Sequence, residues 1–350
     1  MINRVYTGVL RPGFFRMKPE TAHHFTLGML RLAGAVPLVV PILKRIFAPR
    51  QAGPEVKAFG LTFANPVGLA AGYDKEGEAI PGLSSLGFSH LEIGTITPRA
   101  QPGNPSPRVF RIPAEGAVIN RMGFPNRGAE PLVARLRKLA GTTGIYGGAI
   151  LGVNLGKNKT TPLEDAVEDY LSLMRSFAPL SGYLAINVSS PNTPDLRKLQ
   201  TRAALEGLLG ELSRQRQALL PGLGRPLPIL VKLAPDLSWD EIDDALAAIE
   251  ATGMDGVIAT NTTLSREGLR SPLGSEQGGL SGAPLRPLST RIIRYITTHT
   301  RLPVIGVGGI LSLEDACEKL DAGAILIQLY TGLIYAGPGL VQTILNGLSH

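Results

Sequence analysis

The sequence predicts an α/β protein: a (β/α)8 TIM barrel with a small N-terminal helical extension that associates with a membrane. Beyond residue 55, eight short apolar runs ending in Gly, Asn or Thr alternate with stretches of helical periodicity. The runs are continuously apolar rather than alternating, which is typical of parallel strands buried on both faces. Eight strand–helix units in roughly 290 residues fit the usual length of such a barrel.

The expected strands lie at residues 65–72, 90–96, 149–156, 183–189, 228–234, 256–262, 303–309 and 324–330. A doubly wound sheet is the alternative, but that fold usually has fewer strands and a GxGxxG motif after the first strand, which this chain lacks. In a barrel the active site forms at the C-terminal ends of the strands. The residues that close the eight runs are therefore the candidates for chemistry.

The first fifty residues differ from the rest in charge. They hold eight Lys and Arg against Glu20 alone, which accounts for the whole net charge of +7. A helical pattern begins at Pro19, and an uncharged run of twelve residues follows from Leu32 to Leu43. Spanning a bilayer takes roughly 20 apolar residues, so this run is too short. We expect two short helices lying on a membrane surface. A helical pair packed on the core of the chain itself is the alternative.

This difference in charge and hydropathy also predicts the domain organisation. Residues 1–50 are expected to form a membrane-associating segment and residues 51–350 the barrel. Because the barrel carries no net charge, we expect no nucleic-acid partner.

The composition excludes several kinds of site. Cys317 is the only cysteine, so an intramolecular disulfide and a multi-cysteine metal site are excluded. The five histidines lie away from the strand ends, and Asp74 is the only carboxylate there. A zinc site and a glycosidase carboxylate pair are therefore not expected. We expect no metal.

The strand ends carry mainly amides, hydroxyls, glycines and two lysines. A primary amide offers a donor and an acceptor in one plane, which suits a flavin or a pyrimidine. One lysine near a flavin would stabilise the charge of its reduced form, and the other would pair with a substrate carboxylate. Glycines after the seventh and eighth strands would present N–H groups to a phosphate. Together these features indicate FMN rather than a dinucleotide.

Ten short motifs extend this interpretation: AAGYDK, EIGTITP, INRMGFPN, GVNLGKNK, NVSSPNTPDLR, VKLAPDL, IATNTT, GGLSG, GVGGI and QLYTG. In order and spacing they resemble the dihydroorotate dehydrogenase family in its membrane-associated, quinone-using class, class 2. The resemblance covers almost the whole chain. It includes the motif PETAH within residues 1–50, the segment called the head below. It implies oxidation of (S)-dihydroorotate to orotate by one non-covalently bound FMN, with a quinone as electron acceptor, in pyrimidine biosynthesis.

The resemblance also assigns roles to residues. Ser190 stands where the family has its catalytic base, and Thr193 would hold a water through which the proton leaves. The residues expected to bind the pyrimidine are Lys75, Asn120, Arg121, Met122, Gly123, Phe124, Asn187, Asn192, Asn261 and Thr262. Those expected to bind FMN are Ala70, Ala71, Gly72, Tyr73, Asp74, Thr95, Asn154, Asn187, Lys232, Thr260, Gly282, Gly309, Tyr330 and Thr331.

The head receives its roles in the same way. His23 and Arg111 stand where the family lines its quinone tunnel; a structural role for His23 on an apolar helix is the alternative. The implied location is peripheral, on the cytoplasmic side of a bacterial inner membrane.

Three rival functions remain. The soluble class of the same family uses a cysteine base in the loop after the fourth strand, whereas Cys317 falls in the expected helix after the seventh strand. A flavin-dependent tRNA dihydrouridine synthase needs a cysteine acid and a basic surface. A membrane-surface scaffold that only binds FMN is the third.

Overall fold

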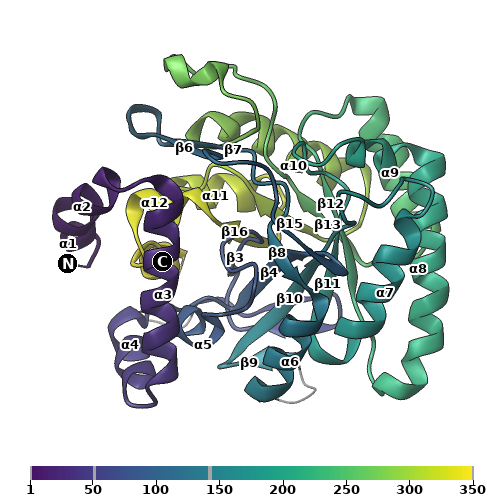
Figure 1. The fold of residues 1–350 in the computed structure, drawn as a ribbon, viewed down its shortest axis with the longest axis horizontal. Helices are drawn as coiled ribbons and strands as arrows, with labels where there is room; N and C mark the ends of the chain where they lie inside the picture. The colour runs from purple at the N-terminus through teal and green to yellow at the C-terminus, as the bar shows by residue number, and fades with distance from the viewer. Residues whose placement is uncertain (1, 50–52, 141–143, 349–350) are drawn as a thin grey trace.

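Eight parallel strands close into a barrel in the computed structural model, which describes residues 2–49, 53–140 and 144–348 (Figure 1). The boundary expected between residues 50 and 51 lies outside the described residues. Pairing of β16 with β3 and of β10 with β11 completes the ring, and each strand lies within one predicted run. The strands are β3 (Val67–Leu69), β4 (His90–Ile96), β10 (Ala149–Leu155), β11 (Tyr183–Asn187), β12 (Ile229–Leu233), β13 (Gly256–Ala259), β15 (Val304–Val307) and β16 (Leu326–Leu329).

The barrel helices pack around the outside of the strands (Figure 1). Their ends follow local sequence signals: Ser238 caps one helix by accepting from Glu241 N at 3.2 Å, and the Glu241 carboxylate accepts from Ser238 N at 2.7 Å. The helices are α5 (Ile80–Ser84), α6 (Ala129–Ala140), α7 (Ala166–Phe177), α8 (Arg202–Leu223), α9 (Trp239–Ala251), α10 (Arg286–His299), α11 (Leu313–Asp321), α12 (Thr331–Ala336) and α13 (Leu340–Leu348).

The core has two layers. The larger lies between strands and helices and contains the fully buried Tyr170 and Phe177. The smaller fills the barrel interior around Tyr183, and Phe63 closes its N-terminal end. Phe63 belongs to an antiparallel hairpin of β1 (Val56–Ala58) and β2 (Leu61–Phe63). One end of the barrel is therefore sealed by apolar packing.

Short strands that the sequence did not predict lie outside the barrel ring. A three-stranded antiparallel sheet joins β6 (Val109–Ile112), β7 (Ala117–Asn120) and β14 (Gly279–Gly282). A second pair joins β5 (Arg99–Gln101) and β8 (Asn126–Gly128), and β9 (Ile145–Tyr146) pairs antiparallel with β10. The turns of 3-10 helix are η2 (Pro113–Glu115), η3 (Ala178–Leu180), η4 (Leu196–Gln200), η5 (Pro272–Ser275) and η6 (Ala283–Leu285).

The described part of the head is mostly helical and lies along one side of the barrel (Figure 1). It comprises α1 (Ile2–Val5), the π-helical turn η1 (Tyr6–Leu10), α2 (Arg11–Arg16), α3 (Pro19–Ala35) and α4 (Val39–Phe47). The first three of these were not predicted. The break between α3 and α4 falls at Val36, because the following Pro37 disfavours a helical backbone there.

The helix α3 packs closely on α5. A Cβ atom on Gly82 would lie 2.2 Å from Leu30 O, so only glycine permits this crossing. Ala22 and Leu27 are buried toward the barrel, whereas Phe25, Met29, Leu32, Leu38, Ile42 and Ile46 are exposed. The helical pair therefore packs on its own chain through one face and leaves an apolar face open. No described helix alone is long and apolar enough to cross a membrane; α3 and α4 together meet that test but bend by 116°.

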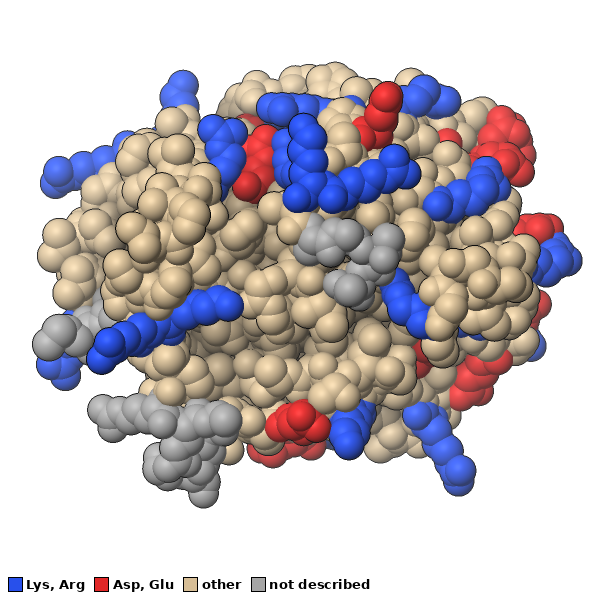
Figure 2. Space-filling view, turned by 90° about the horizontal axis from the view of Figure 1, so that it is seen from below, with Lys and Arg blue, Asp and Glu red and all other residues tan. Residues whose placement is uncertain are grey.

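The charge distribution also differs between the head and the barrel. Figure 2 shows the lower face of the molecule, with the head on the left. Uncharged and basic residues cover most of that side of the face, whereas acidic residues lie over the middle and the opposite side, interspersed with basic ones.

Candidate active site

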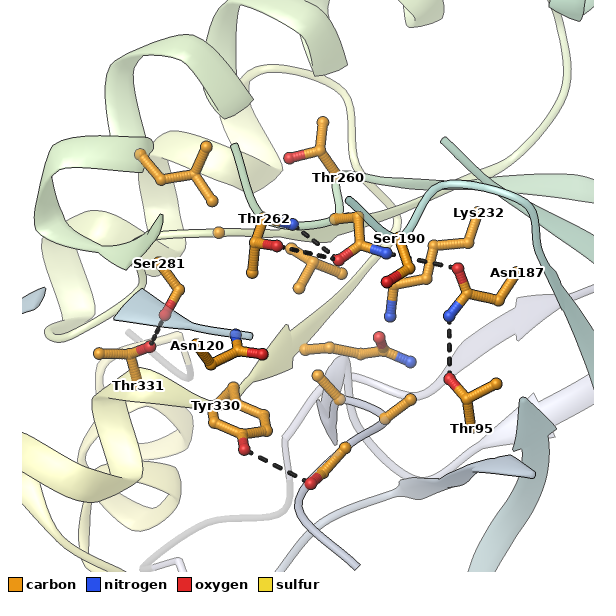
Figure 3. Close-up of a pocket in the computed structure, with 18 of the residues that line it drawn as sticks. Thr95, Asn120, Asn187, Ser190, Lys232, Thr260, Thr262, Ser281, Tyr330 and Thr331 are labelled. Atoms are coloured by element: carbon orange, nitrogen blue, oxygen red, sulfur yellow. Dashed lines mark hydrogen bonds between the residues drawn. The ribbon is translucent and has the colours of Figure 1, made fainter. Parts of the chain in front are cut away.

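A cavity opens at the C-terminal ends of the barrel strands (Figure 3). It brings together most of the residues predicted for substrate and cofactor: Ala70, Ala71, Gly72, Lys75, Thr95, Asn120, Met122, Gly123, Phe124, Asn187, Ser190, Asn192, Lys232, Thr260, Asn261, Thr262, Gly282, Gly309, Tyr330 and Thr331. It is also lined by Gly308, one of the glycines expected after the seventh strand, and by residues that the sequence did not single out: Ser281, Leu285, Val307, Ile310 and Gln328.

Amide side chains at neighbouring strand ends hold one another in place. Asn187, at the end of β11, donates through Nδ2 to Thr95 Oγ1 at 2.9 Å and to Asn154 Oδ1 at 3.0 Å. Thr95 Oγ1 in turn donates to Asn154 Oδ1 at 2.5 Å. On the other side, Asn261 Nδ2 donates to Ser189 Oγ at 2.9 Å. Because these bonds join different strands, the amides are fixed before any ligand arrives.

The loop after β11 carries one hydroxyl that lines the cavity and a second that is buried nearby. Ser190 is 5% exposed, and its Oγ accepts from Asn192 N at 3.2 Å. Figure 3 shows Ser190 among the residues drawn around the cavity, together with Asn187 and Lys232. Thr193 is buried nearby but does not line the cavity, and its Oγ1 has no hydrogen-bond partner among the described residues. A buried hydroxyl without a partner is costly, so this position suits a bound water.

A residue that the sequence analysis missed joins two of the predicted loops. Asn104 Nδ2 donates to Asn192 O at 3.2 Å and to Arg121 O at 3.0 Å. Asn192 Nδ2 also donates to Asn120 Oδ1 at 3.3 Å. Asn104 lies in the motif PRAQPGN, outside any apolar run, and no periodicity marks it.

The two lysines of the cavity have different partners. Lys75 Nζ donates to Gly72 O at 2.7 Å. Burial, and to a smaller extent the positive charge of Arg108, lowers the pKa of Lys75 to about 8. Lys232 Nζ lies 3.3 Å from Glu92 Oε1. Glu92 was missed by the sequence analysis, although a carboxylate inside the apolar run HLEIGTI was a signal for it.

Five predicted residues do not line this cavity: Tyr73, Asp74, Arg121, Asn154 and Thr193. The Asp74 carboxylate accepts from the backbone N–H groups of Glu78 and Ala79, both at 2.8 Å, and burial raises its pKa to about 6. The Arg121 guanidinium pairs with Glu276 Oε2 at 2.6 Å. Asp74 therefore shapes its own loop, and the charge of Arg121 is already paired.

Glycines form the end of the cavity toward α10 and α12. A Cβ atom on Gly309 would lie 2.4 Å from Arg286 Cβ, so the backbone approaches α10 more closely than any other residue allows. At the start of α12, Thr331 Oγ1 donates to Ser281 Oγ at 2.9 Å (Figure 3). Backbone N–H groups and hydroxyls at a helix start are suited to a phosphate.

A second cavity lies between the head and the barrel. It shares Asn120, Met122 and Tyr330 with the first cavity. Its lining is mostly apolar and aromatic: Tyr6, Phe14, Phe15, Pro19, Glu20, Ala22, His23, Thr26, Tyr73, Val109, Arg111, Val118, Asn120, Met122, Tyr330, Leu333 and Ile334.

Both predicted tunnel residues line this second cavity. The His23 ring packs edge-on against Tyr73 with centroids 5.1 Å apart, and burial lowers the pKa of His23 to about 3. Arg111 donates to Phe14 O at 3.0 Å and to Met17 O, at the end of α2. Its guanidinium lies 4.6 Å from the centroid of Phe15. Arg111 thus attaches the head to β6.

Comparisons with known proteins agree with this geometry. The family model described as dihydroorotate dehydrogenase matches residues 54–350. A dihydroorotate dehydrogenase (quinone) of Ralstonia nicotianae is 49% identical over 352 residues, covering 100% of both chains. One of Roseiflexus castenholzii is 47% identical and covers 97% of this chain and 91% of its own. The crystal structure of the Eimeria tenella enzyme in complex with ferulenol has a TM-score of 0.85 at 36% identity, covering 93% and 89% of the two chains.

Proposed function

The chain belongs to the dihydroorotate dehydrogenase family, and we propose that its first cavity holds FMN and dihydroorotate and its second cavity admits a quinone. The reaction is the oxidation of dihydroorotate to orotate with a quinone as electron acceptor, in pyrimidine biosynthesis. The observation that carries the proposal is the pair of adjoining cavities, one polar at the strand ends and one apolar beneath the head.

The residues of the first cavity fit FMN. Thr260 Oγ1 and Gln328 Oε1 are buried without hydrogen-bond partners among the described residues, so both are available to a ligand. The glycine-lined end suits the phosphate, and Lys232 suits the flavin edge that becomes negative on reduction. We propose one non-covalent FMN per chain, held by the predicted residues that line the cavity. For Asp74 and Asn154 we propose an indirect role, through the loop and through Thr95.

Bound FMN supplies the acceptor for a hydride; the residues of the chain position the substrate and move a proton. Ser190 Oγ takes the substrate proton, and Thr193 holds the water that carries it away. A positioned base of this kind usually accelerates a reaction by about 10²–10⁴. Asn120, Asn187, Asn192 and Asn261 pair with the pyrimidine ring, and Thr262 closes one side.

Lys75 binds the carboxylate of the substrate. Its lowered pKa of about 8 leaves it mostly protonated at neutral pH. Because Arg121 is paired with Glu276, its contribution comes through the backbone of the stretch 121–124, which also contains Met122, Gly123 and Phe124.

The head delivers the quinone. His23 and Arg111 line the second cavity, and the exposed apolar face of α3 and α4 stands beside Lys44 and Arg45 in the last turn of α4. Such a basic, apolar face suits peripheral attachment to anionic lipid. We propose that residues 1–50 form this membrane segment, that residues 51–350 form the catalytic barrel, and that the protein lies on the cytoplasmic side of a bacterial inner membrane.

A spectroscopic experiment tests the proposal. The purified protein should be yellow, dihydroorotate should bleach it in the absence of oxygen, and a quinone should restore the colour. A protein that carries FMN but is not bleached would be a scaffold, and one without any flavin would refute the assignment of FMN.

A further inference from the structure

A buried carboxylate lies beneath the first cavity, and the reaction described above does not use it. Glu92 projects from β4 into the barrel interior and is 0% exposed. Its Oε1 lies 3.3 Å from Nζ of Lys232, which projects from β12 and lines the cavity. The two charges lie on strands that are far apart in the sequence, at the level where the barrel interior meets the cavity.

All contacts of this carboxylate come from donors. Asn154 Nδ2 donates to Oε1 at 2.8 Å, Gln328 Nε2 donates to Oε2 at 2.8 Å, and the Tyr183 hydroxyl donates to Oε2 at 3.2 Å. Burial raises the pKa of Tyr183 well above its usual value, so its hydroxyl stays protonated. An ionised carboxylate only accepts hydrogen bonds, so donors from four other strands match a negative charge at Glu92.

The ammonium group depends on this carboxylate. Lys232 is 5% exposed, and within the described residues Glu92 is the only acidic group that forms an ion pair with it. A buried ammonium without a counter-ion is costly and tends to lose its proton. The other titratable groups nearby are Tyr183 and His90 in the barrel interior and Lys75 and Tyr330 on the cavity wall. Burial raises the pKa of both tyrosines and lowers the pKa of His90 to about 4, so none of these groups carries a negative charge at neutral pH.

We propose that Glu92 is a positioning residue: it is the counter-ion that keeps Lys232 charged and directed at the cofactor, and it limits how strongly that charge favours the reduced cofactor. This inference rests on the proposed binding of FMN. The hydride brings two electrons and one proton to the cofactor, and the second substrate proton leaves through Ser190. One negative charge therefore remains at the cofactor, next to Lys232.

The substitution Glu92→Gln tests the charge without changing the shape. The new amide would place an N–H group where Glu92 accepts from Gln328, and Gln328 can turn its own amide because its Oε1 has no partner among the described residues. The readout is the two-electron midpoint potential of the bound flavin, measured by spectroelectrochemical titration between pH 6 and pH 9.

The substitution removes the charge that offsets Lys232, so at pH 6 the equilibrium should shift at least tenfold toward the reduced cofactor, about 30 mV. Lys75 titrates in both proteins, so it cancels in the difference between variant and wild type.

Tyr183→Phe is the matched control, because it removes one donor from the same carboxylate and keeps both charges. In this variant the equilibrium between oxidised and reduced cofactor should stay within about twofold of the wild-type value at every pH. The inference is overturned if Glu92→Gln also stays within twofold of wild type from pH 6 to pH 9, or if Tyr183→Phe produces the same shift.

A double variant covers the case in which Glu92→Gln does not fold. If Glu92 serves only as a counter-ion, removing both charges in Glu92→Gln/Lys232→Met should restore folding, followed by thermal denaturation. A double variant that still does not fold would overturn the inference. A wild-type protein that lacks FMN or is not bleached by dihydroorotate would instead contradict the proposed function.

Discussion

The two cavities are built in different ways. The first lies at the ends of rigid strands, and its amides are joined across strands, as Asn187 is to Thr95 and Asn154. The second lies between the head helices and the barrel, and its lining is mostly apolar. Its two predicted polar residues already have structural roles or surroundings. Burial keeps the His23 ring neutral, and Arg111 donates to backbone carbonyls at the end of α2.

This difference indicates a division of labour. Under the proposed function, the strand ends supply the base, the cation and the amides that the oxidation of dihydroorotate needs at fixed positions. The helices packed on the barrel would supply the apolar path by which a hydrophobic quinone approaches the flavin. Substitutions in one cavity should therefore leave the half-reaction of the other almost unchanged.

The largest expected effect comes from Ser190→Ala. Reduction of the flavin by dihydroorotate should slow by about 10²–10⁴, because the positioned base is lost. FMN should remain bound, and reoxidation by quinone should barely change. Stopped-flow absorbance measures both half-reactions separately. Ser190→Cys should recover activity above about pH 8.5, where a thiol ionises. Flavin reduction at the wild-type rate in Ser190→Ala would remove Ser190 from the mechanism.

The second prediction concerns Lys75 and orotate. Binding should weaken about tenfold per pH unit above pH 8, because the free protein then loses the Lys75 proton, whose pKa is about 8. Lys75→Met should weaken binding by roughly 10–100-fold at pH 7, the usual worth of a hydrogen bond to a charged group. It should also abolish this pH dependence. Titration of the flavin absorbance with orotate measures both.

A matched control keeps this test specific. Lys198→Met removes an exposed lysine that pairs with Asp195 in the loop after β11. It should reproduce the wild-type affinity and pH dependence. If Lys75→Met retained the wild-type pH dependence, the substrate carboxylate would have another partner.

The third prediction concerns the second cavity. Arg111→Ala removes the bonds from the barrel to the end of α2, so the tunnel wall should loosen and the KM for a long-chain quinone should rise about tenfold. Reduction of the flavin by dihydroorotate should stay at the wild-type rate. The control is Arg127→Ala, which removes an exposed arginine whose Nη1 lies 3.6 Å from Glu78 Oε1. Slowed flavin reduction in Arg111→Ala alone would show that the two cavities are coupled.

The smallest effect concerns the barrel end opposite the first cavity. His90 is buried against Phe63 with centroids 5.4 Å apart, and burial lowers its pKa to about 4. The folded state therefore disfavours protonation that the unfolded chain accepts near pH 6.5. The contribution of His90 to stability should be lost as the pH falls from about 6.5 toward 4, by about 1 kcal/mol between pH 7 and pH 5.5.

Urea unfolding at several pH values measures this loss. The variant His90→Gln should reduce the slope of stability against pH, whatever its absolute stability. Flavin reduction at pH 7 should not respond, because His90 lines neither cavity. An unchanged slope would show that other groups control the acid sensitivity.

The sequence by itself determined the barrel and most of the first cavity. Eight continuously apolar runs can only be parallel strands covered on both faces, and such strands collect their closing residues at one end. Asn187, Lys232 and Thr260 therefore meet in space although they close different runs. The excess charge of residues 1–50 likewise marked the head as a separate element.

Only the tertiary structure decided which polar side chains line the cavity and which are bonded to other groups of the chain. Asp74 and Arg121 stand in the right motifs, yet one is bonded to backbone N–H groups and the other to Glu276. Glu92 meets Lys232 across 140 residues of sequence. Periodicity reports only the local face of a strand or helix, so it cannot pair charges that meet through barrel closure.

The head shows the same limit. The sequence indicated a proline-interrupted apolar helical pair, but α1 and α2 were not predicted, and nothing local showed that Gly82 would let α3 lie against α5. The second cavity exists only because these helices pack on the barrel and Arg111 holds them there. Its shape is set by contacts between elements, and a contact of that kind leaves no periodic signal in either partner.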